Sequence, residues 1–520
     1  MIRVLLGLAL LLLGGGAGIA VYAIGVVEQK LTDKGFHWAE QSIRLPSLAW
    51  SGIEGPGMNA SLLLVQPSWP VQVQLLDAKI DPSTLPADAS NTASNASGTT
   101  STNSIDIPFE VHARNLSVSW KEHSLVSGMN GSLFPIISLS NEANSIEAAW
   151  DPAKPRHIHG TANTRLEHEY ATAEVSAEFN LGAFIELELK SSNLVVRHKF
   201  LAGQPMPEIP FKTRLVWKAD TREIAAEGEI GEVAWNAIGT TDTKTHDMLI
   251  RIPMTPLSSI VSLFGGLIPE SEAAEIVGEV GLAAHIAGPP WEWSFEPAAQ
   301  DLSVSGALPD QFGGDRVRWR RNGVPFETGP ASTGWVNLDN AGWLPEAAIA
   351  AEDIRFRTHP GFDLVAIQEA LDASMNEERM RGGSTITQQL CKNLFLDGRR
   401  TLLRKLRELV LAMNMENRMS KDAILALYLN VVEFGPGING IAEASHAWFL
   451  KDPAHLSPRE AAFLVSILPA PNMWHKRISK TKEVPIRRVN EVLNRMRIRG
   501  TLSVGEHRRA IQERLRVVPP

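Results

Sequence analysis

The hydrophobic periodicity of the chain changes near residue 335, and this change constrains the fold more than any other feature of the sequence. Upstream, apolar and polar residues alternate, as at 109–120 and 174–181, whereas downstream the apolar residues recur at helical spacing. Alternation is typical of half-buried strands, and the second pattern indicates amphipathic helices. We therefore predict a multidomain α+β fold. A β-rich domain at 30–314 is followed by a linker at 315–334, a mainly α-helical domain at 335–500 and a basic tail at 501–520.

The downstream region contains six apolar runs that predict helices, at 344–351, 386–396, 402–415, 423–429, 458–468 and 484–499. A shorter apolar stretch at 257–268 is interpreted either as a helix on the β-rich domain or as a surface that touches lipid. Segment 87–103 is almost entirely Ala, Ser, Thr, Asn, Asp and Gly. Such a composition cannot bury enough apolar surface to order itself, so we predict a disordered loop there.

The beginning of the chain predicts a membrane anchor. Residues 4–27 carry no side-chain charge and are dominated by Leu, Ile and Val, and about 20 apolar residues suffice to cross a bilayer as a helix. The only charges before this stretch are the amino terminus and Arg3, which favours a cytoplasmic N-terminus. We expect residues 1–29 to form an uncleaved, single-pass transmembrane helix in the cytoplasmic (inner) membrane, with the body in the periplasm or extracytoplasmic space. A cleaved signal peptide is the alternative.

Charge is distributed unevenly along the 520 residues. The formal net charge is −8, but residues up to 330 carry 23 Lys and Arg against 37 Asp and Glu, and the remainder carry 27 against 21. The positive region suits an anionic ligand, but charge alone favours a solvated basic face with no ligand. The single cysteine, Cys391, excludes an intramolecular disulfide and a multi-cysteine metal site. Its helix position favours a packed thiol over a nucleophile.

Three downstream segments place side chains at spacings that suit chemistry. Glu352 and Asp353 follow an apolar run, and a carboxylate in a partly desolvated cleft has a raised pKa and can act as a base. Thr385 and Gln388 match a capping box. On the helix that this box begins, residues 385, 389 and 392 share one face and can hold an oxygen-rich anion.

The third segment flanks Glu408 with Arg404 and Lys405 within one helical turn, which favours the ionised carboxylate. Taken alone, the first segment is better explained by a helix end and the second by a capped amphipathic helix. For the third segment, surface ion pairing is an alternative that the spacing does not decide.

Together, and in this order, the segments resemble the family 51 glycosyltransferases, the peptidoglycan transglycosylases, in their monofunctional form. The matching motifs are EDIRFRTHPGFD at 352–363, GGSTITQQLCKN at 382–393, RKLRE at 404–408, a fourth that begins at Tyr428, and a last one within 460–472. The resemblance covers about residues 335–500. It implies a lysozyme-like domain that polymerises lipid II into β-1,4 glycan strands, with inversion and release of polyprenyl pyrophosphate. Only some 20 residues follow Gly500, so we expect no transpeptidase domain.

The resemblance also implies residue roles. Glu352 would be the catalytic base that deprotonates the acceptor 4-hydroxyl, and Glu408 the second catalytic carboxylate, acting at the pyrophosphate. The implied substrate-binding residues are Asp353, Phe356, His359, Ser384, Thr385, Gln388, Gln389, Lys392, Asn393, Arg404 and Lys405. No organic cofactor is implied, while a divalent cation, Mg²⁺ or Mn²⁺, at Glu408 is left open. The implied partners are lipid II, the lipid-linked glycan strand, the membrane and, through the β-rich domain, proteins of cell-wall synthesis, with no nucleic acid.

Two other functions stay open. One is a non-catalytic, membrane-anchored scaffold or lipid II-binding protein in which the β-rich domain does the work. The other is a lysozyme-like hydrolase that cuts finished glycan. The cations at 392, 404 and 405 speak against the hydrolase, because a neutral glycan leaving group needs no anion site.

Overall fold

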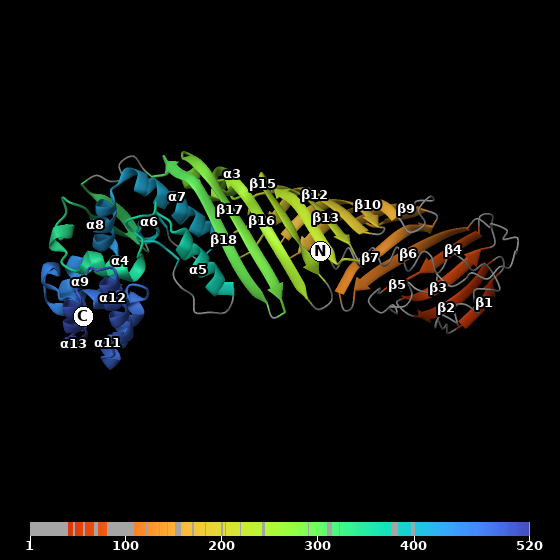
Figure 1. The fold of residues 1–520 in the computed structure, drawn as a ribbon. Coiled ribbons are helices and arrows are strands. Elements are labelled where there is room, and N and C mark those ends of the chain that lie inside the picture. The colour runs from red at the N-terminus through yellow and green to blue at the C-terminus, as the bar shows by residue number, and fades with distance from the viewer. Residues whose placement is uncertain are drawn as a thin grey trace. The chain divides into compact units, whose positions relative to one another are not determined.

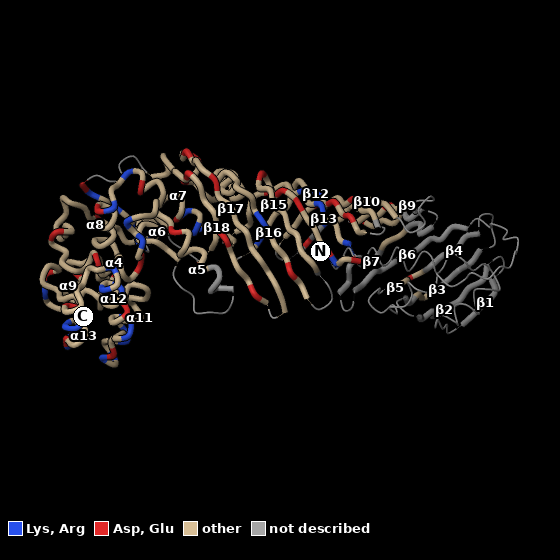
Figure 2. Tube along the Cα trace, in the orientation of Figure 1, with Lys and Arg blue, Asp and Glu red and all other residues tan. Residues whose placement is uncertain are grey.

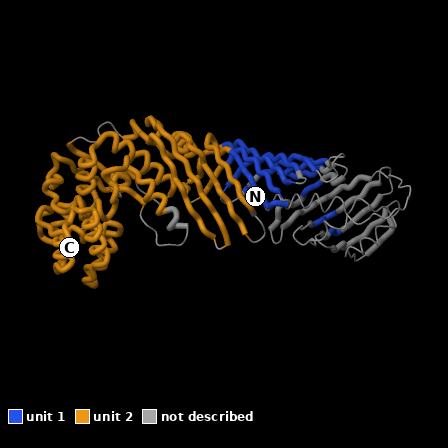
Figure 3. The backbone as a smooth tube through the Cα atoms, in the orientation of Figure 1, with its two compact units in different colours: residues 1–194, 210–228 blue, residues 195–209, 229–520 orange. Residues whose placement is uncertain are grey.

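The computed structural model describes residues 40–518 apart from internal stretches, of which the longest are 81–108, 151–157 and 376–382. Within this part of the chain, none of the helices is long and apolar enough to cross a membrane. The predicted span at 4–27 and the predicted disordered loop at 87–103 lie outside the described residues. The chain divides into two compact units, residues 1–194 with 210–228, and residues 195–209 with 229–520 (Figure 3).

The first unit consists of strands in its described part, as the alternation predicts. Successive strands pair antiparallel from β1 to β4 and from β6 to β11, and β4 and β5 run parallel to β6. Leu187 and Leu189 of β12 are buried against Ala177 of β11 and contribute to a small core. The strands of this unit, including three that extend a residue or two past its limits, are β1 (Glu40–Arg44), β2 (Ser47–Gly55), β3 (Met58–Gln66), β4 (Val71–Leu76), β5 (Lys79–Ile80), β6 (Phe109–Trp120), β7 (His123–Phe134), β8 (Ile136–Ser140), β9 (Asn144–Trp150), β10 (Ile158–His168), β11 (Ala171–Leu181), β12 (Phe184–Val196), β13 (Ile209–Lys218) and β14 (Glu223–Ile230).

The second unit begins with four antiparallel strands, β15 (Val233–Thr241), β16 (His246–Pro256), β17 (Glu275–Gly288) and β18 (Glu292–Ser305) (Figure 1). Helix α3 (Leu257–Ser262) and two short 3₁₀ turns (Gly265–Leu267 and Pro269–Ser271) connect β16 to β17. Their side chains Leu257, Val261, Phe264 and Ile268 are buried. The apolar stretch at 257–268 therefore forms a helix packed on the β-strands, which confirms the first of its two interpretations.

Residues 315–334, which the sequence analysis places in a linker, contain a β-hairpin of β19 (Val317–Arg321) and β20 (Val324–Thr328). Trp319 of this hairpin is 6% exposed, and its ring stacks on Phe326 with the centroids 5.4 Å apart. Trp319 belongs to the same buried cluster as the helices that follow. The hairpin is thus part of the core of the helical region.

The helical region confirms all six predicted helices to within a few residues. It also contains four helices that the periodicity did not reveal, α5, α9, α11 and α13. Two of these have little apolar pattern to detect, because α11 buries only Ile478 and α13 only Ala510. The helices are α4 (Leu344–Glu352), α5 (Leu364–Met375), α6 (Ile386–Phe395), α7 (Leu402–Arg418), α8 (Lys421–Val431), α9 (Gly440–Phe449), α10 (Pro458–Ile467), α11 (Pro471–Thr481), α12 (Ile486–Ile498) and α13 (Val504–Gln512), with 3₁₀ turns at Leu338–Asn340 and Pro453–His455 and a short strand pair, β21 (Glu433–Gly435) and β22 (Ile438–Asn439).

Within the second unit, helix α7 joins the helices to strand β18. Val410 and Met413 of α7 share a buried cluster with Val304 of β18. The buried side chain of Asn414 donates from Nδ2 to the carbonyl of Val304 at 2.9 Å and accepts from the amide of Leu308 at 2.7 Å. Strands β15–β18 and the helices therefore belong to one compact unit, although the domain boundaries predicted from sequence themselves stay a prediction.

Candidate active site

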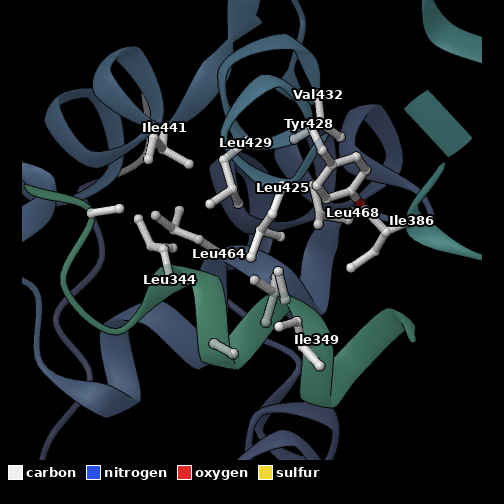
Figure 4. Close-up of a cluster of buried hydrophobic side chains, with 14 of the residues drawn as sticks. Leu344, Ile349, Ile386, Leu425, Tyr428, Leu429, Val432, Ile441, Leu464 and Leu468 are labelled. Carbon is white, nitrogen blue, oxygen red and sulfur yellow. The ribbon is translucent and has the colours of Figure 1, made fainter. Parts of the chain in front are cut away.

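Helix α4 positions Glu352 as its last residue. Its apolar face, with Leu344 and Ile349, packs against Leu425 of α8 and Leu464 of α10 (Figure 4). Arg495 of α12 donates from Nη1 to the carbonyl oxygen of Ala351 at 3.1 Å. Because the last carbonyls of a helix lack intrahelical partners and carry partial negative charge, this guanidinium stabilises the end of α4. The backbone at Glu352 is thereby held in place.

The Glu352 carboxylate accepts a hydrogen bond through Oε2 from Nε2 of Gln389 on α6, at 3.0 Å. Burial raises the pKa of Glu352, while the Gln389 hydrogen bond and the charges of Arg488, Lys392 and Arg495 oppose that rise without cancelling it. A carboxylate with a raised pKa is a stronger base once it is ionised. Glu352 is half-buried at the end of α4, and its role as a base stays a prediction.

Asp353 is 6% exposed and ties α4 to the beginning of α6. Both of its carboxylate oxygens lie 2.9 Å from Nε2 of His359, and Oδ2 also accepts from the amide of Ile386 at 2.9 Å. Since Nδ1 of His359 accepts from the amide of Gly361, Nε2 is the protonated ring nitrogen that donates to Asp353. Asp353 and His359 thus fix the relative positions of the segments that carry Glu352 and Gln389.

The predicted capping box at the beginning of α6 is confirmed. Thr385 accepts from the amide of Gln388, whose side chain accepts from the amide of Thr385, both at 3.1 Å. The Thr385 hydroxyl also donates to the carbonyl of Gly361 at 2.7 Å. Both side chains are buried, and their contact with substrate stays a prediction.

Of the predicted face of α6, Gln389 and Lys392 act on Glu352. Gln389 donates to its carboxylate, and Lys392 is one of the charges that oppose the rise in its pKa. Thr385 lies instead at the N-cap, below the surface. Asn393 is half-buried, and its role in binding stays a prediction.

Helix α7 brings two cations to a buried carboxylate. Glu408 is 1% exposed, with Lys405 Nζ hydrogen-bonded to its Oε2 and Arg404 Nε 3.2 Å from its Oε1, so the predicted ion pairs are confirmed. Lys405 also donates to the hydroxyl of Ser384 at 2.7 Å, which links α7 to the residues before α6. The side chain of Lys405 is 45% exposed, so this cation remains accessible to an anion.

A metal site does not follow from this geometry. Among the residues that the structure describes, no three His, Cys, Asp or Glu side chains gather closely enough to hold an ion. Glu408 is flanked by Arg404 and Lys405, and such a cationic surrounding suits an anion better than Mg²⁺ or Mn²⁺, which bind through oxygen ligands. The divalent cation at Glu408 stays a prediction.

Phe356 packs inside the loop that follows α4. Its ring is fully buried, lies edge-on to His359 with the centroids 6.2 Å apart, and has Lys421 Nζ of α8 4.6 Å from its centroid. The same Lys421 donates to the carbonyl of His359 at 2.6 Å. These contacts hold the loop from Asp353 to His359, while a direct contact of Phe356 with substrate stays a prediction.

The sequence of this region is similar to that of known proteins. The sequence model of the family described as Transglycosylase matches residues 326–497. The protein from Shewanella amazonensis, named a biosynthetic peptidoglycan transglycosylase, is 44% identical over 173 residues, which are 33% of this chain and 70% of the relative. The chain belongs to the transglycosylase family.

Two further members with the same name are similar over a shorter length. The protein from Cronobacter sakazakii is 46% identical over 142 residues and that from Thiobacillus denitrificans 45% over 144, each match covering 27% of this chain. The chain spans 59% and 62% of these two relatives. A crystal structure of penicillin-binding protein 1A from Haemophilus influenzae is 28% identical over 19% of this chain and 15% of its own, with a TM-score of 0.18, which carries no argument about the fold.

Three residues at the site were missed by the sequence analysis, Tyr428, Arg488 and Arg495. Tyr428 was quoted only as the first residue of the fourth motif, and its hydroxyl in fact donates to Oε1 of Gln389 at 3.1 Å. Arg488 and Arg495 lie in a predicted helix, but no local signal indicated that this helix packs against α4. Residues 471–518 carry 13 Lys and Arg against 4 Asp and Glu. The positive charge of the helical region is therefore concentrated in α11–α13 and the segments around them (Figure 2).

The single cysteine of the chain offers a test of its predicted packing role. Cys391 is fully buried on α6, and burial raises the pKa of its thiol well above the ordinary value. Because the thiolate is the reactive form, we expect no modification of the native protein by iodoacetamide at pH 8 and one adduct after denaturation. Intact-protein mass measures both. Rapid alkylation of the folded protein would contradict the assignment.

Proposed function

We propose that this protein is a peptidoglycan glycosyltransferase that polymerises lipid II into β-1,4 glycan strands. Membership of the transglycosylase family supports the class of reaction. The observation that carries the assignment is the Glu352 carboxylate, which is desolvated, has a raised pKa and is oriented by Gln389. These are the properties of a general base at a displacement reaction.

In this mechanism, Glu352 takes the proton from the 4-hydroxyl of the acceptor lipid II. The oxygen attacks the anomeric carbon of the lipid-linked glycan, the new C–O bond forms with inversion, and the bond to the pyrophosphate breaks. The leaving polyprenyl pyrophosphate keeps the electron pair. A single base suffices for such an inverting displacement when the leaving group needs no protonation.

The leaving group requires positive charge that is in place before the reaction. Lys405 and Arg404 are held at Glu408, and Lys392 lies on the α6 face that also carries Gln389. Preorganised cations stabilise developing charge without reorganising during the reaction. We assign these three cations to the pyrophosphate and Glu408 to holding two of them in position.

The proposed location follows from the substrate and from residues 4–27. An uncharged span of this length would tether the enzyme to the cytoplasmic membrane with its body outside, where lipid-linked precursors are polymerised. We propose that the first unit binds proteins of cell-wall synthesis.

The test uses the purified full-length protein with fluorescent lipid II in detergent. We expect glycan strands that a muramidase digests, and release of polyprenyl pyrophosphate, with Glu352→Gln as the inactive control. No polymer across detergents, with and without Mg²⁺ or Mn²⁺, would overturn the proposal. Lipid II binding without turnover would favour the scaffold, and release of fragments from isolated sacculi would favour the hydrolase.

A further inference from the structure

A chain of hydrogen bonds runs from the interior of the helical region to the carboxylate of Glu352. The hydroxyl of Tyr428 on α8 donates to Oε1 of Gln389, at 3.1 Å, and Nε2 of Gln389 donates to Oε2 of Glu352, at 3.0 Å. Tyr428 is fully buried, among side chains that include Ile386, Leu425 and Leu468 (Figure 4). One end of this series of hydrogen bonds is therefore shielded from solvent, and the other end is the proposed base.

The two ends of the Gln389 amide are not equivalent in this arrangement. With Oε1 toward Tyr428, Nε2 faces Glu352 and donates to its ionised carboxylate. If the amide turned over, Oε1 would face Glu352 and could bind only the protonated carboxyl, since an ionised carboxylate is purely an acceptor. The orientation of this amide is thus coupled to the protonation state of Glu352.

The Tyr428 hydroxyl stabilises one of the two orientations. Burial, and to a lesser extent the charges of Glu352 and Asp353, raise the pKa of Tyr428 well above its ordinary value, so the phenol keeps its proton. A protonated phenol satisfies the amide oxygen in the observed orientation. If the amide turned over, Nε2 could donate to the phenol oxygen, but the buried phenol hydrogen would then lose its acceptor. That loss is unfavourable, so the observed orientation is held from the interior side.

We propose that Tyr428 is a positioning residue for Glu352, fixing the Gln389 amide in the orientation that donates to the ionised carboxylate. The proposal rests on the proposed function, in which ionised Glu352 is the base. The other charged groups that act on Glu352 are Lys392 on α6 and Arg488 and Arg495 on α12. None of these is altered when the phenol loses its oxygen, so a Tyr428→Phe change isolates the hydrogen-bond chain.

The test is the pH dependence of polymerisation by the full-length protein. A base must be ionised to act, so activity falls as the pH drops through the pKa of Glu352. Without the fixed donor the protonated carboxyl is favoured, so the pKa of Glu352 rises. We therefore expect the acid limb of the pH–rate profile, where activity falls with falling pH, to lie about one pH unit higher in Tyr428→Phe. The variant should lose about tenfold in rate below this limb and little above it. An effect that is uniform at all pH values would overturn the proposal.

A matched control removes another buried hydroxyl from the same core. Ser466 is 1% exposed and donates to the carbonyl of Phe463 at 2.8 Å. We expect Ser466→Ala to leave the acid limb unchanged, and an equal shift in this variant would show that Tyr428 acts only through general packing.

A second variant keeps the proposal testable if Tyr428→Phe does not fold. Gln389→Leu removes the link from the other end, and it should move the acid limb at least as far as Tyr428→Phe. When both single variants fold, the double variant should move the limb no further than Gln389→Leu alone, because residues that act through one another are not additive. An unmoved limb in Gln389→Leu, or additive shifts, would overturn the proposal.

Failure of the proposed function can be told apart from failure of this inference. If the wild-type protein forms no glycan, the carboxyl band of Glu352 can still be titrated by infrared difference spectroscopy, with Glu352→Gln as the reference. The inference predicts that the midpoint of this titration rises in Tyr428→Phe, and an unchanged midpoint would refute it without any assay of activity.

Discussion

Glu352→Gln is expected to lower the rate of glycan formation by about 10²–10⁴-fold, the usual contribution of a general base. The amide has nearly the shape of the carboxyl group and can still accept from Gln389, so the site keeps its geometry while losing its base. Polymerisation of labelled lipid II under single-turnover conditions measures the loss. An active Glu352→Gln variant would remove Glu352 from the mechanism.

The same change is expected to stabilise the fold at neutral pH. The pKa of Glu352 is higher in the folded protein than in the unfolded chain, where it is near 4.5. The folded state therefore binds this proton more tightly than the unfolded chain does. The stability that this proton contributes is fully present at pH values below the pKa of Glu352 in the unfolded chain. It is lost as the pH rises through the pKa of Glu352 in the folded protein. Glutamine has no proton to lose. Thermal unfolding should show a higher midpoint for Glu352→Gln at pH 7–8 and no difference near pH 4.

Glu460 provides the matched control for both effects. It is 7% exposed, but its carboxylate is 2.7 Å from Nζ of Lys451 and caps the beginning of α10. Here the charge is stabilising, so Glu460→Gln should lower the unfolding midpoint while the chemistry is retained. If Glu352→Gln also lowered the midpoint at neutral pH, the unfavourable burial of its charge would be refuted.

The sequence predicts best what is local in the chain. The capping box of Thr385 and Gln388 and the pairing of Glu408 with Arg404 and Lys405 each lie within one helical turn, and all of them are present in the structure. The six predicted helices have clear apolar spacing. Glu352 and Gln389 were each identified as candidate site residues. The hydrogen bond between them joins two helices and was not predicted.

The contacts that the sequence did not reveal are long-range. The sequence pattern of helix α7 is amphipathic, yet its residues from Val410 to Met415 are all buried. One side packs in the helical core through Leu411 and Met415, and the other packs near β18 through Val410 and Met413. Periodicity assigns one buried face to a helix and cannot identify a second partner that lies about 100 residues earlier in the chain. The hydroxyl of Tyr428 was missed for the same reason, because its partner is 39 residues away.

The second side of α7 leads to a large expected effect at Asn414, whose side chain bonds to Val304 and Leu308. Asn414→Ala would leave the buried amide of Leu308 without its acceptor and would open a small cavity between α7 and β18. A buried polar group without a partner costs about 1–3 kcal/mol, and with the cavity we expect a loss of about 2–4 kcal/mol in the free energy of unfolding. For a unit of about 300 residues that corresponds to a fall of roughly 3–6 °C in the unfolding midpoint.

Asn417 supplies the control for this prediction, since it is an exposed amide of the same helix that donates to the same carbonyl of Val304, at 2.9 Å. Asn417→Ala should cost less than about 1 kcal/mol, because water replaces its hydrogen bonds. Calorimetry of both variants tests the packing of α7 on β18. Far-UV circular dichroism, followed at wavelengths that weight helix and strand differently, shows which elements unfold in each transition. If strands β15–β18 and the helices form one cooperative unit, Asn414→Ala lowers a single shared transition for both. If the helices unfold at the wild-type temperature while the strands unfold at a lower one, strands β15–β18 and the helices are separate cooperative units.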